Sequence, residues 1–308
     1  MPTPSEPALR GEWAARTDSP KRSVFGNYRA DDSNSGGRES APSKQRRLTS
    51  AATNGPTALQ ASIDLAIARS FIHRFLAKAY EDPMPDTWRW LAQMPDSIRA
   101  ANAFIGQTVL ASAEALINAL HSGGFDSFLN AYLAAFGHAA RGSCPLNEIE
   151  YGDIKADPLF QPHRLADLAA FYRAFGLEVT GDAGERQDHL CLELEFMCVL
   201  AAKEAYTLEH QLDAEQLAQC RDAQKQFIRE HLGRWTPAFS RRLAIATSEP
   251  TLRALAEFTG AFIESECVRF GVNPGSQDLS LRPVDEAVDR MCNSCGIANL
   301  PPGALAAT

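Results

Sequence analysis

The sequence predicts an all-α protein, organised as a single compact helical domain of about ten helices with a disordered N-terminal tail. Ala and Leu recur at helical spacing, whereas aromatic and β-branched residues do not alternate as they do in strands. A hydrophobic content of 45% in 308 residues is enough for one large core. The stretch from Gln187 to Leu208 is apolar on nearly every side, interrupted only by Glu193 and Glu195, so we expect it to form a buried central helix.

The chain divides into three parts by composition. Residues 1–55 are rich in Ser, Pro, Gly and Arg and lack apolar periodicity, which predicts a disordered tail. Residues 56–275 carry the helical pattern, and residues 276–308 form a loop-like C-terminal extension with one short helix over 284–292. We therefore expect one helical domain with an extension at each end.

The helices of the domain follow from apolar spacing and from the residues that stop them. The first begins near Pro56 and Thr57 and ends at Asp82 and Pro83. A long helix runs from Pro95 to the Gly123–Gly124 stop. The remaining predicted helices span residues 86–93, 125–136, 163–175, 187–208, 213–232, 236–246 (opened by Pro237) and 249–270 (closed by Gly271).

Charge and cysteine content limit the class of protein. The net charge is −8, but the tail carries nine Lys and Arg against six Asp and Glu, which leaves 21 basic and 32 acidic residues on the rest. An acidic domain disfavours nucleic-acid binding and favours a basic partner.

The sequence also limits the location of the protein. Seven cysteines do not form a disulfide framework, and no uncharged apolar stretch reaches the roughly 18 residues of a membrane span. Arg46 and Arg47 precede polar residues rather than the apolar stretch of an export signal, so we expect a cytoplasmic protein without stable membrane insertion.

Polar residues that could form a binding site gather at two places. The loop Cys144–Gly152 contains Glu148, Glu150 and Tyr151, and Asp188 and His189 open the central helix, where a carboxylate is favoured by the helix dipole. If the loop packs near the start of this helix, the two groups form one acidic patch that could bind a cationic peptide. The alternative is an exposed acidic loop without a ligand.

Metal and catalytic chemistry have weaker signals. His189 and Glu193 are four residues apart, which favours contact on one helix face, but HLCLE is neither a zinc nor a diiron motif. The pair Cys292 and Cys295 forms a CxxC that supplies two ligands of the four a metal needs, so unliganded thiols are favoured over a metal or redox site. Without a nucleophile or phosphate-loop motif, we expect no enzyme activity and no cofactor of its own.

Three motifs resemble the TorD/DmsD/NarJ family of cytoplasmic chaperones, which mature molybdenum enzymes. They are ARSFIHRFLAKAYEDP (Ala68–Pro83), CPLNEIEYGD in the middle loop and DHLCLELEFM (Asp188–Met197). The resemblance spans about residues 60–270. The Glu148–Gly152 motif is most similar to chaperones of type II dimethyl sulfoxide reductase family molybdoenzymes.

The resemblance implies an all-helical fold and a partner, the catalytic subunit of a molybdoenzyme. Family members bind the twin-arginine signal peptide of this subunit and delay its export until the molybdopterin cofactor is inserted. Asp188 and His189 match the peptide-site pair of the family, and Tyr151 matches the aromatic residue of its central loop. With the acidic residues above, the predicted peptide-binding set is Asp188, His189, Tyr151, Glu148, Glu150 and Glu193.

Several alternatives stay open at this point. The protein could be a NarJ-like assembly factor for a nitrate reductase subunit that is not exported. It could also deliver a metal or act in redox chemistry through Cys292 and Cys295. The sequence is compatible with a monomer or a dimer.

Overall fold

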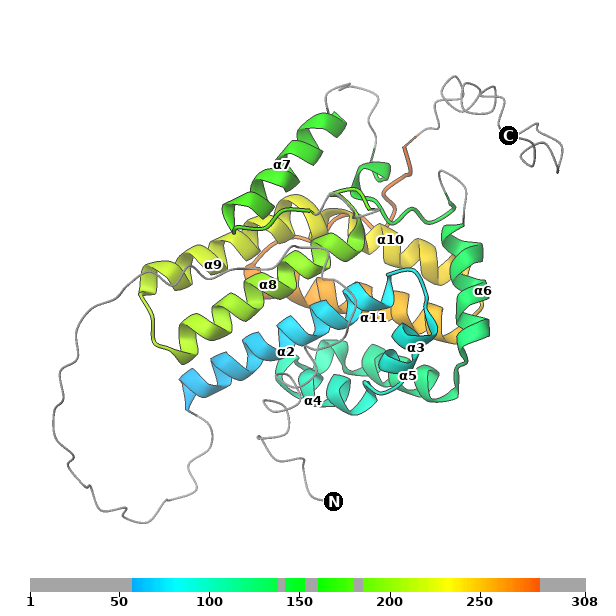
Figure 1. Ribbon diagram of the computed structural model, residues 1–308, viewed down its shortest axis with the longest axis horizontal. Coiled ribbons are helices and arrows are strands. Elements are labelled where there is room, and N and C mark those ends of the chain that lie inside the picture. Colours follow the sequence, from blue (N-terminus) through cyan, green and yellow to red (C-terminus); the bar gives the residue numbers. More distant parts are fainter. Residues whose placement is uncertain (1–56, 138–141, 153–159, 180–184, 283–308) are drawn as a thin grey trace, which may run out of the picture.

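Two antiparallel helices, α2 (Ala58–Ala79) and α8 (Leu190–Glu209), form the centre of the computed structural model (Figure 1). The structure describes residues 57–137, 142–152, 160–179 and 185–282. Thr57 caps α2 by accepting a hydrogen bond from the Gln60 amide, at the start that the sequence predicts. The described ranges contain helices and two isolated β-bridges but no strand, which confirms the all-α prediction.

The other helices pack around this pair. Helix α11 (Pro250–Phe270) is joined to the α2 region by the Arg69–Glu266 and Tyr80–Thr259 hydrogen bonds. The π-helical turn η3 (Ile228–Leu232) joins α9 (Ala214–Phe227) to α10 (Gly233–Ala246) without a break. The remaining elements are α3 (Pro85–Leu91), α4 (Pro95–Ile105), η1 (Gln107–Val109), α5 (Leu110–Ser122), α6 (Phe125–Phe136), η2 (Glu148–Glu150) and α7 (Phe160–Ala174). None of the helices in these ranges is both long enough and apolar enough to cross a bilayer.

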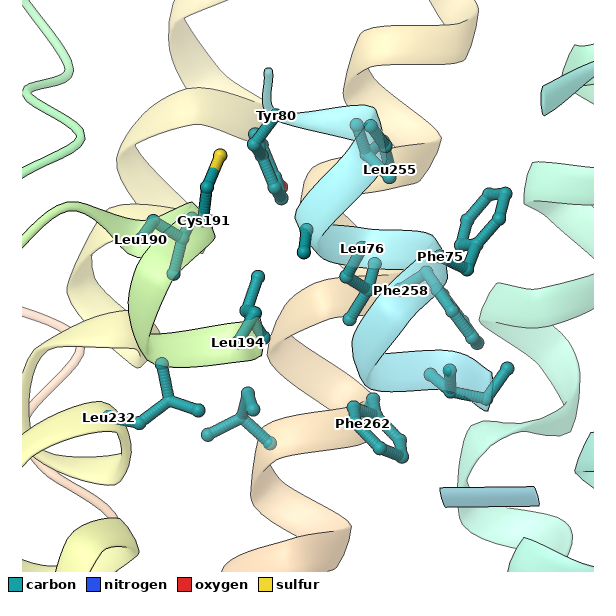
Figure 2. Close-up of a cluster of buried hydrophobic side chains, with 14 of the residues drawn as sticks. Phe75, Leu76, Tyr80, Leu190, Cys191, Leu194, Leu232, Leu255, Phe258 and Phe262 are labelled. Atoms are coloured by element: carbon teal, nitrogen blue, oxygen red, sulfur yellow. The ribbon is translucent and has the colours of Figure 1, made fainter. Parts of the chain in front are cut away.

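The apolar core lies where α2, α8 and α11 meet. Figure 2 shows Leu76 of α2, Leu194 of α8 and Phe262 of α11 directed toward one another. All three side chains are fully buried. Burial of a large apolar side chain contributes about 1.5–3 kcal/mol, so this contact region is the main source of stability for the central pair.

A buried ion network crosses the same region and was not predicted from the sequence. The guanidinium of Arg69 on α2 donates to both carboxylate oxygens of Glu266 on α11, at 2.6 and 2.5 Å. It also donates to Glu204 of α8 at 3.0 Å and to Gln224 of α9 at 2.7 Å. The Arg69, Glu204 and Glu266 side chains are at most 2% exposed, so four helices converge on one buried arginine.

Three predicted details of the helices are wrong. The predicted helix from Pro95 breaks at Gly106, whose φ of 126° no longer fits a helix, and α4 and α5 result. Pro237 lies inside α10 rather than at its start, because α10 continues directly from η3. Asp188 lies before α8, since His189 has an extended backbone and caps the helix.

A strap formed by residues 272–282 follows α11 and returns across the middle loop. Its Gly275 amide donates to Gly233 O at 2.9 Å, and its far end donates from Arg282 N to Glu150 O at 2.8 Å. Between them, Gly152 N donates to Ser280 O at 2.9 Å. The strap therefore holds the C-terminal part of the loop, at residues 150–152. The tail and the C-terminal residues from 283 onward, including the predicted helix over 284–292, lie outside the described residues.

Replacing Gly275 by Ala is expected to lift the strap from the loop. A Cβ atom at this position would overlap the backbone carbonyl of Arg234, which cannot move without disturbing α10. Overpacking of this kind costs about 1–3 kcal/mol. Amide hydrogen exchange at Gly152 should become faster, whereas in Gly124→Ala, where a Cβ meets nothing within 4 Å, it should stay unchanged. Equal exchange rates in both variants would contradict this role of the strap.

Candidate functional site

The middle loop packs directly on the start of α8, which is the condition stated above for one acidic patch. Glu148 N donates to Asp188 O at 2.9 Å, and Leu190 N donates to Leu146 O at 2.8 Å. These bonds flank an antiparallel bridge between Asn147 and His189. Loop residues 147–152 and residues 185–189 thus form one continuous feature, which we call the loop–helix edge.

Asp188 lies at the centre of the loop–helix edge, and its side chain is fully buried. From the loop, Ile149 N donates to Oδ2 and Asn147 Nδ2 donates to Oδ1, both at 3.2 Å. From the other side, Arg186 Nε donates to Oδ1 at 2.9 Å and Nη2 donates to Oδ2 at 3.0 Å. The carboxylate is therefore a bidentate acceptor for a guanidinium, a geometry that is both strong and selective for arginine.

His189 serves as the cap of α8. Its Nδ1 accepts a hydrogen bond from Cys191 N at 3.3 Å, and its Nε2 lies 3.4 Å from Glu185 Oε2. Burial disfavours the imidazolium and, although the charge of Asp188 opposes it, lowers the pKa of His189 to about 4. The neutral ring suits the cap, because protonation of Nδ1 would remove the acceptor.

This low pKa makes stability depend on pH in a defined window. The unfolded chain binds a proton at His189 near pH 6.5, whereas the folded protein binds it only near pH 4, so acidification favours unfolding. The contribution is fully present above about pH 6.5 and is lost as pH falls through about 4. Between pH 7 and pH 5 we expect His189 to account for about 2 kcal/mol of lost unfolding free energy.

The variant His189→Asn isolates this contribution, because asparagine also caps helices but does not titrate. Denaturant unfolding at pH 7, 6 and 5 should give a flatter pH dependence for the variant than for the wild type. Parallel curves would show that His189 does not titrate with a depressed pKa. Buried carboxylates contribute equally to both proteins and cancel in the comparison.

Glu148 is the member of the loop–helix edge whose side chain joins the loop to η3 and α10. His231 Nδ1 donates to its Oε2 at 2.8 Å, and Arg234 donates to its Oε1 through Nη2 at 3.0 Å. Burial opposes ionisation, but the hydrogen bond and charge of His231, followed by the charges of Arg234 and Arg164, outweigh it and lower the pKa of Glu148. Glu148 is therefore an ionised, fully buried anchor.

The other predicted site residues differ in accessibility. Tyr151 is fully buried, donates to Pro145 O at 2.9 Å and packs against Trp235, with ring centroids 5.1 Å apart. Glu150 is partly accessible, and its Oε1 lies 3.6 Å from Arg186 Nη2. Glu193 is fully buried and accepts from Trp235 Nε1 at 3.1 Å. Burial, and after it the charge of Glu148, raises the pKa of Glu193 well above its usual range.

The side chains of His189 and Glu193 pair with other residues rather than with each other, contrary to the predicted contact. The rule for residues four apart applies within a helix, and His189 lies before the first turn with a ψ of 138°. Its ring faces Glu185, whereas Glu193 faces Trp235 in the interior. Both side chains thus have structural partners, and neither is arranged as half of a metal site.

Four residues of the site escaped the sequence prediction: Glu185, Arg186, His231 and Arg234. Arg186 and Glu185 stand in a polar loop whose composition gives no sign of pairing. His231 and Arg234 are more than 80 residues from Glu148 in the sequence. His231 gave the one local signal. It is a polar residue on the apolar face of a predicted helix, and such a position implies a buried polar partner.

Metal ligation finds no support in the part of the chain that the structure describes. No group of three or more His, Cys, Asp or Glu side chains is placed there to hold an ion. Cys144, Cys191, Cys198, Cys220 and Cys267 are free thiols. The predicted pair Cys292 and Cys295 lies outside the described residues.

Comparison with known proteins gives consistent matches. A family model described as nitrate reductase delta subunit matches residues 102–241, which include the loop–helix edge. The selenate reductase assembly chaperone protein of Thauera selenatis is 34% identical over 143 residues, covering 46% of this chain and 68% of that protein. The chlorate reductase assembly chaperone protein of Ideonella dechloratans is 33% identical over 110 residues, covering 36% and 54%.

A third relative is named for a different chaperone. The chaperone protein TorD of Vibrio cholerae is 30% identical over 119 residues, covering 38% of this chain and 52% of that protein. The chain thus spans between about half and two thirds of the length of these relatives. Together with the all-helical fold, these matches show that the chain belongs to the TorD/DmsD/NarJ family of assembly chaperones.

Proposed function

We propose that this protein is a chaperone for the maturation of a molybdopterin-containing oxidoreductase. It binds the catalytic subunit of this enzyme, together with its twin-arginine signal peptide, in the cytoplasm and holds the apo subunit until the cofactor is inserted and export can follow. Family membership supports the chaperone role, and the relatives named for selenate and chlorate reductases support an oxidoreductase client of the type II dimethyl sulfoxide reductase group. The protein itself has no catalytic role in this scheme.

The observation that carries the peptide-binding part is the guanidinium held by Asp188. Its carboxylate already accepts both arms of an arginine, with Glu150 3.6 Å from the same group. A twin-arginine peptide presents two such groups followed by an apolar stretch. The exposed side of the edge carries two further acidic residues, Glu185 and Asp82. Glu185 is 44% exposed. Its pKa is raised by burial and then by the charge of Asp82, which places Asp82 nearby.

The predicted site residues then divide into two roles. Asp188 and Glu150 bind the arginines of the peptide, and His189 fixes the start of α8 beside them. Glu148, Tyr151 and Glu193 are too deeply buried to reach a ligand in this conformation, and they support the loop from below. The apolar stretch of the peptide would extend toward the turn between α2 and α3, where Met84 is 44% exposed.

Co-purification of the client tests this function. The protein carrying an affinity tag is expressed with the molybdoenzyme catalytic subunit from its own genome, either complete or lacking its signal peptide. We expect the complete apo subunit to be retained and the truncated subunit to be retained much less. Failure to retain either form would contradict the chaperone role.

A NarJ-like role is the second candidate, because the matching family model is described as the nitrate reductase delta subunit. In that case the client is not exported and the recognised surface lies in the mature subunit. Equal retention of the complete and the truncated catalytic subunit would favour this role over signal-peptide binding.

A further inference from the structure

The carboxylate of Asp188 has no acceptor position left for a ligand. A carboxylate offers about four acceptor sites, and here two are used by Asn147 Nδ2 and Ile149 N and two by Arg186. The first two bonds hold the loop on α8. A guanidinium from outside can therefore bind Asp188 only in the position that Arg186 occupies.

We propose that Arg186 is an internal stand-in for the client arginine, and that the peptide binds by displacing it from Asp188. This inference rests on the proposed function, since it describes how the same site is regulated. The side chain of Arg186 is 47% exposed, whereas that of Asp188 is fully buried, so Arg186 covers the carboxylate from the solvent side. It is the member of the cluster that can leave without unfolding the edge.

The backbone around Arg186 is compatible with such an exchange. Arg186 O accepts from His189 N at 3.0 Å, which anchors the main chain while the side chain can turn into solvent. Departure without replacement would leave a buried carboxylate with only its two loop donors, which is unfavourable. An incoming guanidinium removes this cost, so displacement by an arginine is favoured over simple opening.

The exchange also sets a threshold for ligands. Arg186 competes from the same chain, at an effective concentration in the millimolar range or above. A ligand with one arginine only exchanges its own guanidinium for that of Arg186 at Asp188, so its net binding free energy is small. A second arginine, which can bind Glu150 or Glu185, or a following apolar stretch must supply the surplus. Arg186 thereby excludes ligands that offer a single arginine and no further contact.

Calorimetric titration of Arg186→Gln tests the competition. The ligands are a synthetic peptide with two adjacent arginines before an apolar stretch and the same peptide with one arginine changed to lysine. Removal of the competitor should tighten binding of both peptides by a similar factor, about tenfold or more, because each has to displace Arg186 from Asp188. Unchanged or weaker binding by the folded variant would overturn the inference.

Two further variants complete the test. Arg99→Gln removes an arginine of equal exposure, 47%, that pairs with Glu114 on the α4–α5 surface, and it should bind both peptides like the wild type. Arg186→Lys keeps the charge but not the two-armed geometry, so it should show a smaller gain. It replaces Arg186→Gln in the titrations if that variant does not fold.

A small probe separates this inference from the proposed function. Methylguanidinium at millimolar concentration should raise the thermal unfolding temperature of Arg186→Gln but not of the wild type or of Asp188→Asn/Arg186→Gln. Stabilisation by methylguanidinium without binding of either peptide would keep the guanidinium site and reject the signal peptide as its ligand. No stabilisation of Arg186→Gln would overturn the stand-in role, whatever the peptides do.

Discussion

Replacing Arg69 by Met is expected to lower the free energy of unfolding by about 3–5 kcal/mol. Methionine fills a similar volume but leaves the carboxylates of Glu204 and Glu266 buried without their main counter-charge. Burial opposes ionisation of Glu266, and the charge of Arg69 is the first factor that outweighs it and lowers the pKa of this carboxyl. Urea unfolding followed by circular dichroism at pH 7 measures the loss.

Two comparisons make this expectation specific. Arg89→Met removes an exposed ion pair with Asp86 and should change stability by no more than about 1 kcal/mol. The double variant Arg69→Met/Glu266→Gln should recover part of the loss, because the buried charge of Glu266 is removed together with its partner. A loss in Arg69→Met as small as in Arg89→Met would show that solvent enters the network and screens it.

The helical fold could be predicted because its helices have local signals at their ends. Thr57 and Asp213 cap their helices, and Gly271 ends α11 with a φ of 63°, each where the sequence places the boundary. The errors at Gly106 and Pro237 have one origin. Glycine is tolerated within helices and proline can begin one, so only the packing of the surrounding helices decides which of these roles applies.

The candidate site could be predicted in part. The loop and the start of α8 were recognised because each gathers polar residues beside apolar segments, and their contact is confirmed by the bonds between Glu148 and Asp188 and between Leu190 and Leu146. The sequence could not show that Arg186 fills the carboxylate of Asp188. It also could not show that His231 and Arg234 neutralise Glu148, because pairing over long separations leaves no periodic pattern.

The burial of its carboxylates, more than their number, determines how the acidic patch can bind a cation. A surface cluster of carboxylates would attract any cation, with weak and salt-dependent affinity. In this protein the charge of Glu148 is paired with His231 and Arg234, and the pKa of Glu193 is raised, so the carboxylate of the patch that accepts the two arms of a guanidinium on separate oxygens is that of Asp188. Under the proposed function, selectivity for arginine depends on one buried group rather than on the total charge of the patch.

Replacing Asp188 by Asn is expected to weaken binding of the client signal peptide by at least about tenfold, equivalent to about 1.4 kcal/mol. Asparagine offers one acceptor oxygen, and its amide group would face the donors Ile149 N and Arg186 Nη2. The charge and the bidentate geometry are lost together. Isothermal titration calorimetry gives the affinity, and circular dichroism verifies that the helices are retained.

The control for Asp188→Asn is Glu257→Gln on α11, because both variants remove one negative charge. Glu257 is 50% exposed and lies 3.8 Å from Arg253, within the same helix. If general attraction between an acidic domain and a basic peptide dominates, the two variants lose affinity equally. If the buried carboxylate recognises arginine directly, Glu257→Gln binds like the wild type, and Arg186→Gln no longer tightens binding once Asp188 is Asn. Unchanged affinity in a folded Asp188→Asn protein would refute the assignment of this residue to the peptide site.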